Sequence, residues 1–282
     1  MTNLPPPRDN LRGAAWLIAD MALNIWALVI VKAMGPDLPA VQIVFLRALV
    51  GLVLLSPLIW RAGNLPRLGQ PGRHAARLGF STLALTTSFY AVAHLPLALF
   101  TAVNFTRPLM LMALAAIVLR ERITGRQWWA GVVGLAGVAV AVQPDQLGSN
   151  AAGLLALAVT VVAGTAAVIV TRQMRTEPTL NMMVSYTGGL ALLTAGPALW
   201  FWQPLSAPGW GAMILVGLFA QTAQFCFLRA QYWGDAGVLA PLGYASLVLS
   251  VGMGFAVFGE VPAPGFWLGT ALIVLAARQG TR

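Results

Sequence analysis

The fold is decided by an apolar run that closes on a charged pair, residues 108–121, which read PLMLMALAAIVLRE. The glutamate that ends the run, Glu121, lies seven residues before Trp128. At a shift of 139 residues the same pair returns as Glu260 and Trp267, and Glu260 again closes a long apolar run. Two related halves, each ending in this unit, are the simplest account of the chain.

The composition of the whole chain points to a bilayer rather than water. Of its 282 residues, 17 are basic and 8 are acidic, so 9% are charged, where a soluble domain carries roughly 25%. Apolar residues make up 59%, and the mean hydropathy is +0.78. Ten spans of roughly 20 residues would use about 200 positions, which leaves no room for a soluble catalytic domain or a nucleic-acid-binding domain. The net charge of +9 comes from basic residues scattered between apolar runs, so no nucleic-acid partner is expected.

On both sides of the run at residues 108–121, and including it, ten apolar stretches predict membrane-spanning helices. Helices are favoured over a β-barrel because the runs are continuous, whereas membrane strands alternate over about 10 residues. The predicted fold is therefore an all-α integral membrane protein with ten transmembrane helices. The predicted spans are Gly13 to Val31, Pro39 to Trp60, Ala75 to His94, Leu97 to Leu119, Gln127 to Val142, Ala151 to Thr171, Thr179 to Trp202, Trp210 to Leu228, Gly237 to Phe258 and Pro264 to Ala277.

The basic residues predict the orientation, because they stay on the cytoplasmic side during insertion. With both termini inside, the outer loops hold only Lys32, and Arg47 and Arg107 fall within spans. The segments Met1 to Arg12 and 278–282 are then cytoplasmic tails. The predicted inner segments hold the remaining basic residues, Arg8, Arg12, Arg61, Arg67, Arg73, Arg77, Arg120, Arg122, Arg126, Arg172, Arg175, Arg229, Arg278 and Arg282.

The two halves are predicted to be inverted repeats, residues 13–143 and residues 144–277. Five spans in each half is an odd number, so the second half must enter the membrane in the opposite sense. The charges agree, because the loops after the second and fourth spans are basic and their counterparts after the seventh and ninth carry no basic residue. Inverted repeats of this kind build carriers whose binding site lies near the midplane, where the halves meet.

The run at 108–121 also resembles the drug/metabolite transporter superfamily, in its ten-helix EamA-type branch. The resemblance covers essentially Gly13 to Ala277 and includes Gln127-Trp128 and the glycine-rich stretch 131–137. The second copy departs from the pattern, with Leu247 where the first has Pro108. Within that branch the chain is similar to YddG-like exporters of amino acids and related metabolites. The resemblance implies efflux across the bacterial inner membrane and no metal or organic cofactor.

Three ionisable side chains lie far from any predicted helix end. At about 1.5 Å per residue, Asp20 in the first span, Arg47 in the second and Arg107 in the fourth each lie about 10 Å or more from the nearer end of their span. Charges at such depth are usually paired or functional. One reading is a salt bridge between Asp20 and one arginine. The other is that the surplus guanidinium, for which we favour Arg107, binds the carboxylate of an amino-acid-like substrate.

Further polar and aromatic residues share helix faces with these charges. Thr82 and Thr86 begin a polar stripe at four-residue steps on the third span, which lines either a cavity or a helix contact. An aromatic ring occurs at matching places in the halves, Phe105 and Tyr244, where core packing is the alternative reading. The predicted substrate site comprises Trp16, Asp20, Asn24, Tyr90, His94, Asn104, Arg107, Gln221, Gln224 and Tyr244.

The sequence argues against an intramembrane enzyme. With only His74 and His94 there is no His-rich metal cluster, and no HExxH, GxSxG or GxxxxGK[ST] motif occurs. A channel-like facilitator is the other alternative, although no acidic ring or filter repeat is visible. Proton coupling and facilitated diffusion both remain open, as does the oligomeric state. The sequence therefore predicts a small-molecule carrier in a lipid bilayer.

Overall fold

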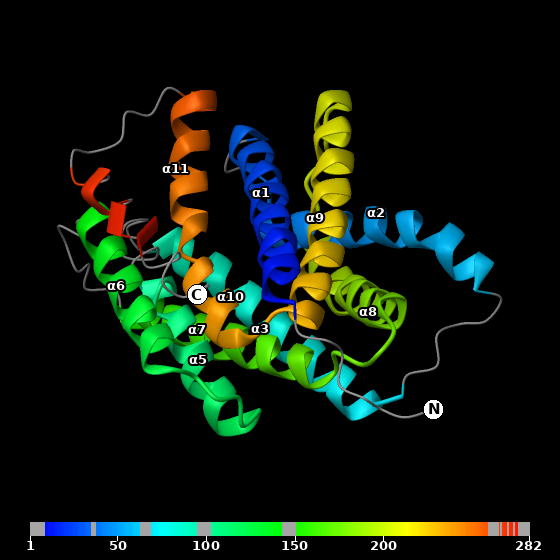
Figure 1. Ribbon diagram of the computed structural model, residues 1–282. Coiled ribbons are helices and arrows are strands. Elements are labelled where there is room, and N and C mark those ends of the chain that lie inside the picture. Colours follow the sequence, from blue (N-terminus) through cyan, green and yellow to red (C-terminus); the bar gives the residue numbers. More distant parts are fainter. Residues whose placement is uncertain are drawn as a thin grey trace.

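The computed structural model describes residues 9–34, 38–62, 69–94, 103–142 and 151–258, and residues 265, 267–269, 271–272 and 274–275. This part of the chain is helical (Figure 1). The last group of residues falls in the predicted tenth span. The helices are α1 (Asn10–Met34), α2 (Ala40–Arg61), α3 (Pro71–His94), α5 (Arg107–Val118), α6 (Gly125–Val142), α7 (Ala151–Gln173), α8 (Thr179–Trp200), α9 (Ala207–Trp233), α10 (Ala236–Leu242) and α11 (Ala245–Phe258).

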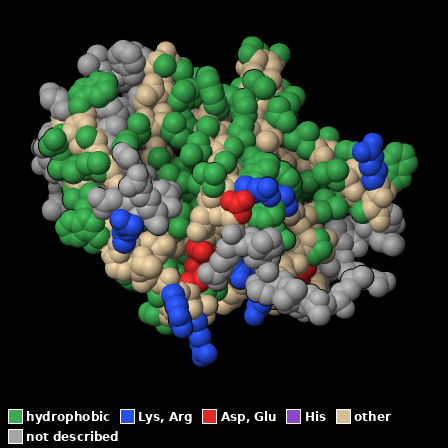
Figure 2. Space-filling model, in the orientation of Figure 1, with side chains coloured by type: hydrophobic (Ala, Val, Ile, Leu, Met, Phe, Trp, Pro, Cys, Tyr) green, Lys and Arg blue, Asp and Glu red, His purple; other side chains and the backbone are tan. Residues whose placement is uncertain are grey.

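The surface of the helices is that of a membrane protein. Within the described residues five helices are long and apolar enough to cross a bilayer, namely α1, α2, α7, α8 and α9. Large apolar side chains point outward from them, and Val53, Leu155 and Leu192 are 69%, 67% and 79% exposed. In Figure 2 apolar side chains cover much of the visible face, and charged ones are few and separated. Such a surface can be buried in lipid because each helix satisfies its own backbone hydrogen bonds.

Prolines mark equivalent positions in the second helix of each half. α2 follows Pro39, with φ −57° and ψ 130°, and α8 follows Pro178, with φ −54° and ψ 131°. The pyrrolidine ring of proline fixes φ, so the backbone enters α2 and α8 in the same conformation. Each helix also contains a second proline near its end, Pro57 in α2 and Pro197 in α8. The repeat in the sequence is thus also a repeat in backbone conformation.

Contacts between helices of the first half and helices of the second half occur in matching pairs. α1 packs along α9 and contacts α11, so it lies between these two helices (Figure 1). In the same way α7, the first helix of the second half, packs along α3 and contacts α5. The second helices of the halves, α2 and α8, lie against each other. Each contact therefore has its counterpart, as expected for two inverted five-helix repeats that meet along one interface.

The fourth and ninth spans, predicted as continuous, are both interrupted. A turn at residues 105–106 precedes α5, and a turn at residues 243–244 separates α10 from α11. Pro108 stands in the first turn of α5, and Pro241 stands inside α10. Since proline lacks an amide hydrogen, neither span keeps an unbroken ladder of helical hydrogen bonds. The two turns fall at matching places in the repeat.

A buried ion pair joins the halves at one end of the bundle. Nη2 of Arg172, in the last turn of α7, lies 3.0 Å from Oε1 of Glu121, just beyond α5. Arg172 also donates to Oε1 of Gln231 at 2.6 Å and to the carbonyl of Gly234 at 3.0 Å. The second oxygen of Glu121 accepts the amide of Ala236 at 3.0 Å. Glu121, which closes the apolar run at 108–121, is thus a salt-bridge partner at the end of its helix.

Candidate functional site

A cavity of about 460 Å³ lies where the two halves meet. Its walls come from α1, α2, α3 and α5 of the first half and from α7, α8 and α9 of the second. Small-molecule pockets commonly occupy roughly 300–1,000 Å³, so the space suits a small ligand. We call it the central cavity. Of the ten predicted site residues, those that line it are Asp20, Asn24, Asn104, Arg107 and Gln224.

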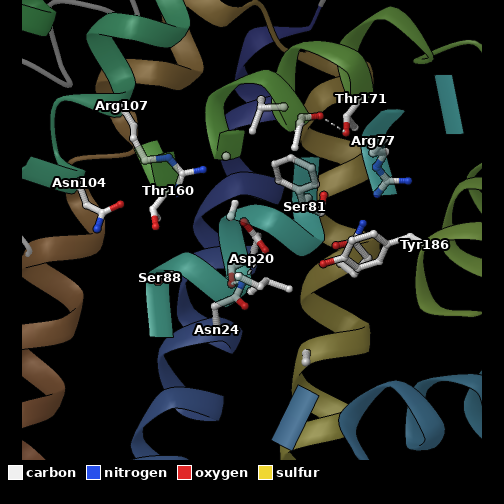
Figure 3. A pocket seen from close by; sticks show the side chains of 18 of the residues that line it. Asp20, Asn24, Arg77, Ser81, Ser88, Asn104, Arg107, Thr160, Thr171 and Tyr186 are labelled. Atoms are coloured by element: carbon white, nitrogen blue, oxygen red, sulfur yellow. Dashed lines mark hydrogen bonds between the residues drawn. The ribbon is translucent and has the colours of Figure 1, made fainter. Parts of the chain in front are cut away.

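The acidic group of the central cavity stands on α1. Asn24 Nδ2 donates to Asp20 Oδ1 at 2.7 Å and to the Asp20 carbonyl at 3.1 Å. Among the described residues no cation lies within ion-pair distance of this carboxylate, so the structure does not show the salt bridge with an arginine that was one of the two readings. In Figure 3 the pair lies between Arg107 and Arg77. Over the same residues, no group of three or more His, Cys, Asp and Glu side chains is placed to hold a metal ion.

Arg107 is the cation that faces this carboxylate from the other wall. It is the first residue of α5 and lines the central cavity, and its guanidinium forms no hydrogen bond or ion pair with any residue that the structure describes. Gly164 of α7 makes room for it, because a methyl group there would overlap Nη2. The sequence placed Arg107 deep within a continuous helix. The structure corrects this to a helix start beside the turn at residues 105–106.

Two further arginines line the central cavity. Arg47 was predicted to lie at depth in the membrane, whereas Arg77 was counted with the cytoplasmic loops. The structure corrects the second assignment, because α3 begins at Pro71 and Arg77 is buried within it. Arg77 Nη1 donates to the carbonyl of Met182 at 2.9 Å, and its guanidinium lies 4.9 Å from the ring centroid of Tyr186. Arg77 therefore has partners on α8, which distinguishes it from Arg107.

The side of α3 that lines the central cavity is not the side that carries the predicted polar stripe. Ser81 and Ser88 line the cavity, in register with Arg77. Thr82 and Thr86 instead face a narrow space shared with α2 and α8, and the Thr86 hydroxyl donates to carbonyls of its own helix. The side chains of the other two members of the stripe, Tyr90 and His94, lie outside the described residues.

Two of the predicted site residues pack between helices and are not in the lining. Trp16 meets Phe225 edge-on, with ring centroids 5.7 Å apart. Gln221 is buried and accepts a hydrogen bond from Thr187 at 3.2 Å, and a methyl group at Gly51 would overlap its amide. Both side chains thus join α9 to neighbouring helices. The spacing of polar residues along the sequence cannot distinguish a side chain that packs between helices from one that lines a cavity.

Tyr244 is also placed in the packed interior. It is fully buried, and its ring lies 6.0 Å from that of Phe105. A methyl group at Gly134 of α6 would overlap the tyrosine ring. The matching aromatics of the two halves therefore pack against each other at the two turns, as in the alternative reading, instead of walling a pocket from both sides.

The sequence analysis missed the contribution of α7. Thr160 and Gly164 line the central cavity, and Thr160 Oγ1 lies 2.8 Å from Thr87 Oγ1 on α3. A shift of 140 residues carries Asp20 onto Thr160 and Asn24 onto Gly164. The internal repeat therefore contained this information. Applied to Asp20 and Asn24, the same shift would have predicted Thr160 and Gly164 as lining residues.

Comparison with known proteins identifies the family. The family model described as "EamA-like transporter family" matches the chain twice, at residues 11–143 and 150–278. The chain belongs to the EamA-like transporter family. It is accordingly a multi-pass membrane transporter and not an enzyme.

Curated relatives cover most of the chain. The pseudopaline exporter CntI of Pseudomonas aeruginosa is 30% identical over 250 residues, 88% of each chain. A riboflavin transporter of Brucella anthropi is 29% identical over 85% of this chain and 87% of its own. An S-adenosylmethionine uptake transporter of Rickettsia prowazekii is 24% identical over 94% of this chain and 91% of its own. These EamA-like relatives move different small molecules.

The fold is found in a solved structure as well. A protein of known crystal structure superposes on this chain with a TM-score of 0.84 over 96% of both chains at 20% identity. At this level of identity the match shows the fold alone. The fold of this chain therefore occurs in a solved structure, and the cargo of the chain has to be argued from the residues of the central cavity.

Proposed function

We propose that this chain is a secondary transporter of the bacterial inner membrane that exports amino acids and related small metabolites, with both termini in the cytoplasm. The substrate binds in the central cavity, and alternating access of the two halves carries it across. The named relatives move three different cargoes. Family membership thus supports a small-molecule substrate, and the charges of the cavity indicate its kind.

The observation that carries the proposal is that one carboxylate and one arginine without a described partner face the same space. Asp20 enters it from α1 and Arg107 from α5. An amino acid presents a carboxylate, which a guanidinium binds through two parallel hydrogen bonds, and an ammonium group, which suits an aspartate. Asn24 and Asn104 also line the cavity, with amide groups that can donate and accept hydrogen bonds.

The balance of charge sets a preference among such substrates. Among the residues that the structure describes, the charged groups in the wall of the central cavity are three arginines, Arg47, Arg77 and Arg107, and the carboxylate of Asp20. Arg77 is engaged by α8, but its charge still contributes to the local potential. Zwitterions and substrates with a second carboxylate are therefore favoured over cations.

Alternating access requires the halves to separate at one end at a time. The end with the Glu121–Arg172 pair is closed by further contacts between the halves. The Asp9 amide donates to the Trp233 carbonyl at 3.0 Å, and the Asp235 amide donates to Asn10 at 2.9 Å. In the predicted orientation this is the cytoplasmic end. These contacts would therefore have to part before a cytoplasmic substrate enters.

The test is transport by the purified chain in proteoliposomes. We expect saturable counterflow of radiolabelled amino acids, accelerated by unlabelled substrate on the opposite side. Removal of the α-amino group from the substrate should weaken transport by the parent chain and have a smaller effect on Asp20→Asn, which has already lost its partner. Runs with and without a pH difference separate proton coupling from facilitated diffusion. Lack of saturable counterflow for every amino acid would overturn the proposal.

A further inference from the structure

A second, smaller space adjoins the central cavity. It measures about 270 Å³ and is lined by residues of α1, α5, α7, α9, α10 and α11. Three residues, Arg107, Val168 and Phe227, line both spaces. The two are therefore neighbours, and Arg107 stands at their common boundary. We call the smaller space the side chamber.

The wall of the side chamber is mainly aliphatic. Leu17 and Met21 line it from α1, Leu111 from α5, and Leu239 and Ala240 from α10. The central cavity differs, because its wall carries four charged side chains together with serine, threonine and asparagine. The boundary at Arg107 is thus a step from polar to apolar surroundings.

Polar side chains in the wall of the chamber are mostly engaged by the protein. The Thr165 hydroxyl donates to the Val161 carbonyl at 2.6 Å, and the Ser246 hydroxyl donates to the Gly243 carbonyl at 2.8 Å. The amide oxygen of Gln231 accepts from Arg172. Since these groups have partners within the protein, the guanidinium of Arg107 is the strong polar feature that remains for a ligand in this space.

We infer that the side chamber holds the apolar part of the substrate while Arg107 holds its carboxylate. The inference rests on the proposed function and narrows its substrate class to carboxylates that bear a sizeable aliphatic or aromatic group. An apolar cavity of about 150 Å³ is large enough to bind benzene, so the chamber has room for a ring or an alkyl chain of several carbons. A short or polar side chain gains nothing from this space.

The inference is tested by binding of a homologous series to the purified chain in nanodiscs. The probes are straight-chain carboxylates from acetate to octanoate, measured by calorimetry. Each methylene that enters the chamber should tighten binding about fourfold until the space is full. Arg107→Ala should weaken every member of the series by a similar factor and leave the gain per methylene unchanged.

Chamber-filling variants separate this effect from partition into lipid. Ala240→Leu puts an isobutyl group into the chamber and should end the gain at a shorter chain length. Ser246→Leu does the same from α11 and serves if the first variant does not fold. Gly252→Leu is the matched control, because a Cβ there would meet nothing within 4 Å. Its series should follow that of the parent chain.

Each outcome decides one question. Affinity that does not depend on chain length, or a length dependence equal in the parent chain and both filling variants, overturns the inference. Affinities that Arg107→Ala leaves unchanged throughout the series also overturn it, because the alkyl chains would then bind in the chamber without placing their carboxylates at the arginine. Failure of amino acid counterflow would instead remove the proposed export function and leave these binding results as they are.

Discussion

Arg172 and Arg107 both lie at the interface between the halves, Arg172 buried and Arg107 half-buried, and they differ in what surrounds them. Arg172 has a carboxylate, an amide oxygen and a backbone carbonyl within 3.0 Å. Arg107 has no partner among the described residues, and a glycine of the opposite half leaves room for it beside the central cavity. A guanidinium held by three groups of the protein stabilises the structure, whereas one that faces an open space is available to a ligand.

The largest effect is expected at Arg172, where Arg172→Met leaves Glu121 buried without its cation. Breaking a buried ion pair on one side costs about 3–5 kcal/mol of unfolding free energy. Thermal unfolding of the purified chain would measure the loss. The double variant Glu121→Gln, Arg172→Met should recover much of it, because no unpaired charge then stays buried. A double variant as unstable as the single one would contradict a structural role for the pair.

At Arg107 the expected effect is on transport and not on stability. Hydrogen bonds to charged groups contribute about 1.5–3 kcal/mol, so Arg107→Ala should lower transport of amino acids about 10- to 150-fold. Its unfolding temperature should stay close to that of the parent chain. Arg107→Lys keeps the charge but loses the two-pronged geometry and should fall in between. A large loss of stability in Arg107→Ala would contradict the proposed difference between Arg107 and Arg172.

A smaller effect is expected when Arg107 is only displaced. In Gly164→Ala the new methyl group would overlap the guanidinium, which has to shift. Crowding of this size costs about 1 kcal/mol, or about a fivefold loss of transport. Gly196→Ala in α8 is the control, because its methyl group would meet nothing within 4 Å. Equal transport by the two variants would show that the position of Arg107 is not critical.

The smallest effect is expected where a polar contact joins helices beside the central cavity. Thr87→Val removes the hydroxyl that lies 2.8 Å from Thr160 Oγ1. Such interhelical hydrogen bonds average about 0.6 kcal/mol in membranes, so the unfolding temperature should fall only slightly. Thr222→Val is the control, since that hydroxyl donates to its own helix at Leu218. A loss of several kcal/mol would assign Thr87 to the supporting structure with Arg172.

The sequence predicted the parts of this architecture that depend on composition and repetition. Long apolar runs require a bilayer, and the match of Glu121 with Glu260 indicated two halves whose odd helix number inverts them. Depth in the membrane also singled out Asp20 and Arg107, which the structure brings to one cavity. These inferences hold because they rest on the energetics of lipid and on topology, and neither depends on side-chain packing.

What the sequence could not predict depends on a rotation or a break within a helix. On α3 a shift of one residue turns the side chain by about 100°, which separates the predicted Thr82 and Thr86 from the observed Ser81 and Ser88. The interruption at residues 105–106 lies beside Asn104, Arg107 and Pro108, and a proline inside a predicted span is compatible with either a kink or a break in the helix. Arg77 lies near the end of a predicted span, and only its contacts with α8 show that its side chain lies in the interior of the protein.

The most direct test of the central claim is the labelling of single cysteines on two different faces of α3. In a Cys226→Ala background, Ser88→Cys would face the central cavity and Thr86→Cys would not. We predict that a membrane-impermeant thiol reagent, applied to vesicles of both orientations, modifies the first variant and spares the second, because thiols react as thiolates in water. A transported amino acid should slow the labelling of Ser88→Cys. Preferential labelling of Thr86→Cys, or labelling of Ser88→Cys that no substrate slows, would contradict a water-filled substrate cavity between the halves.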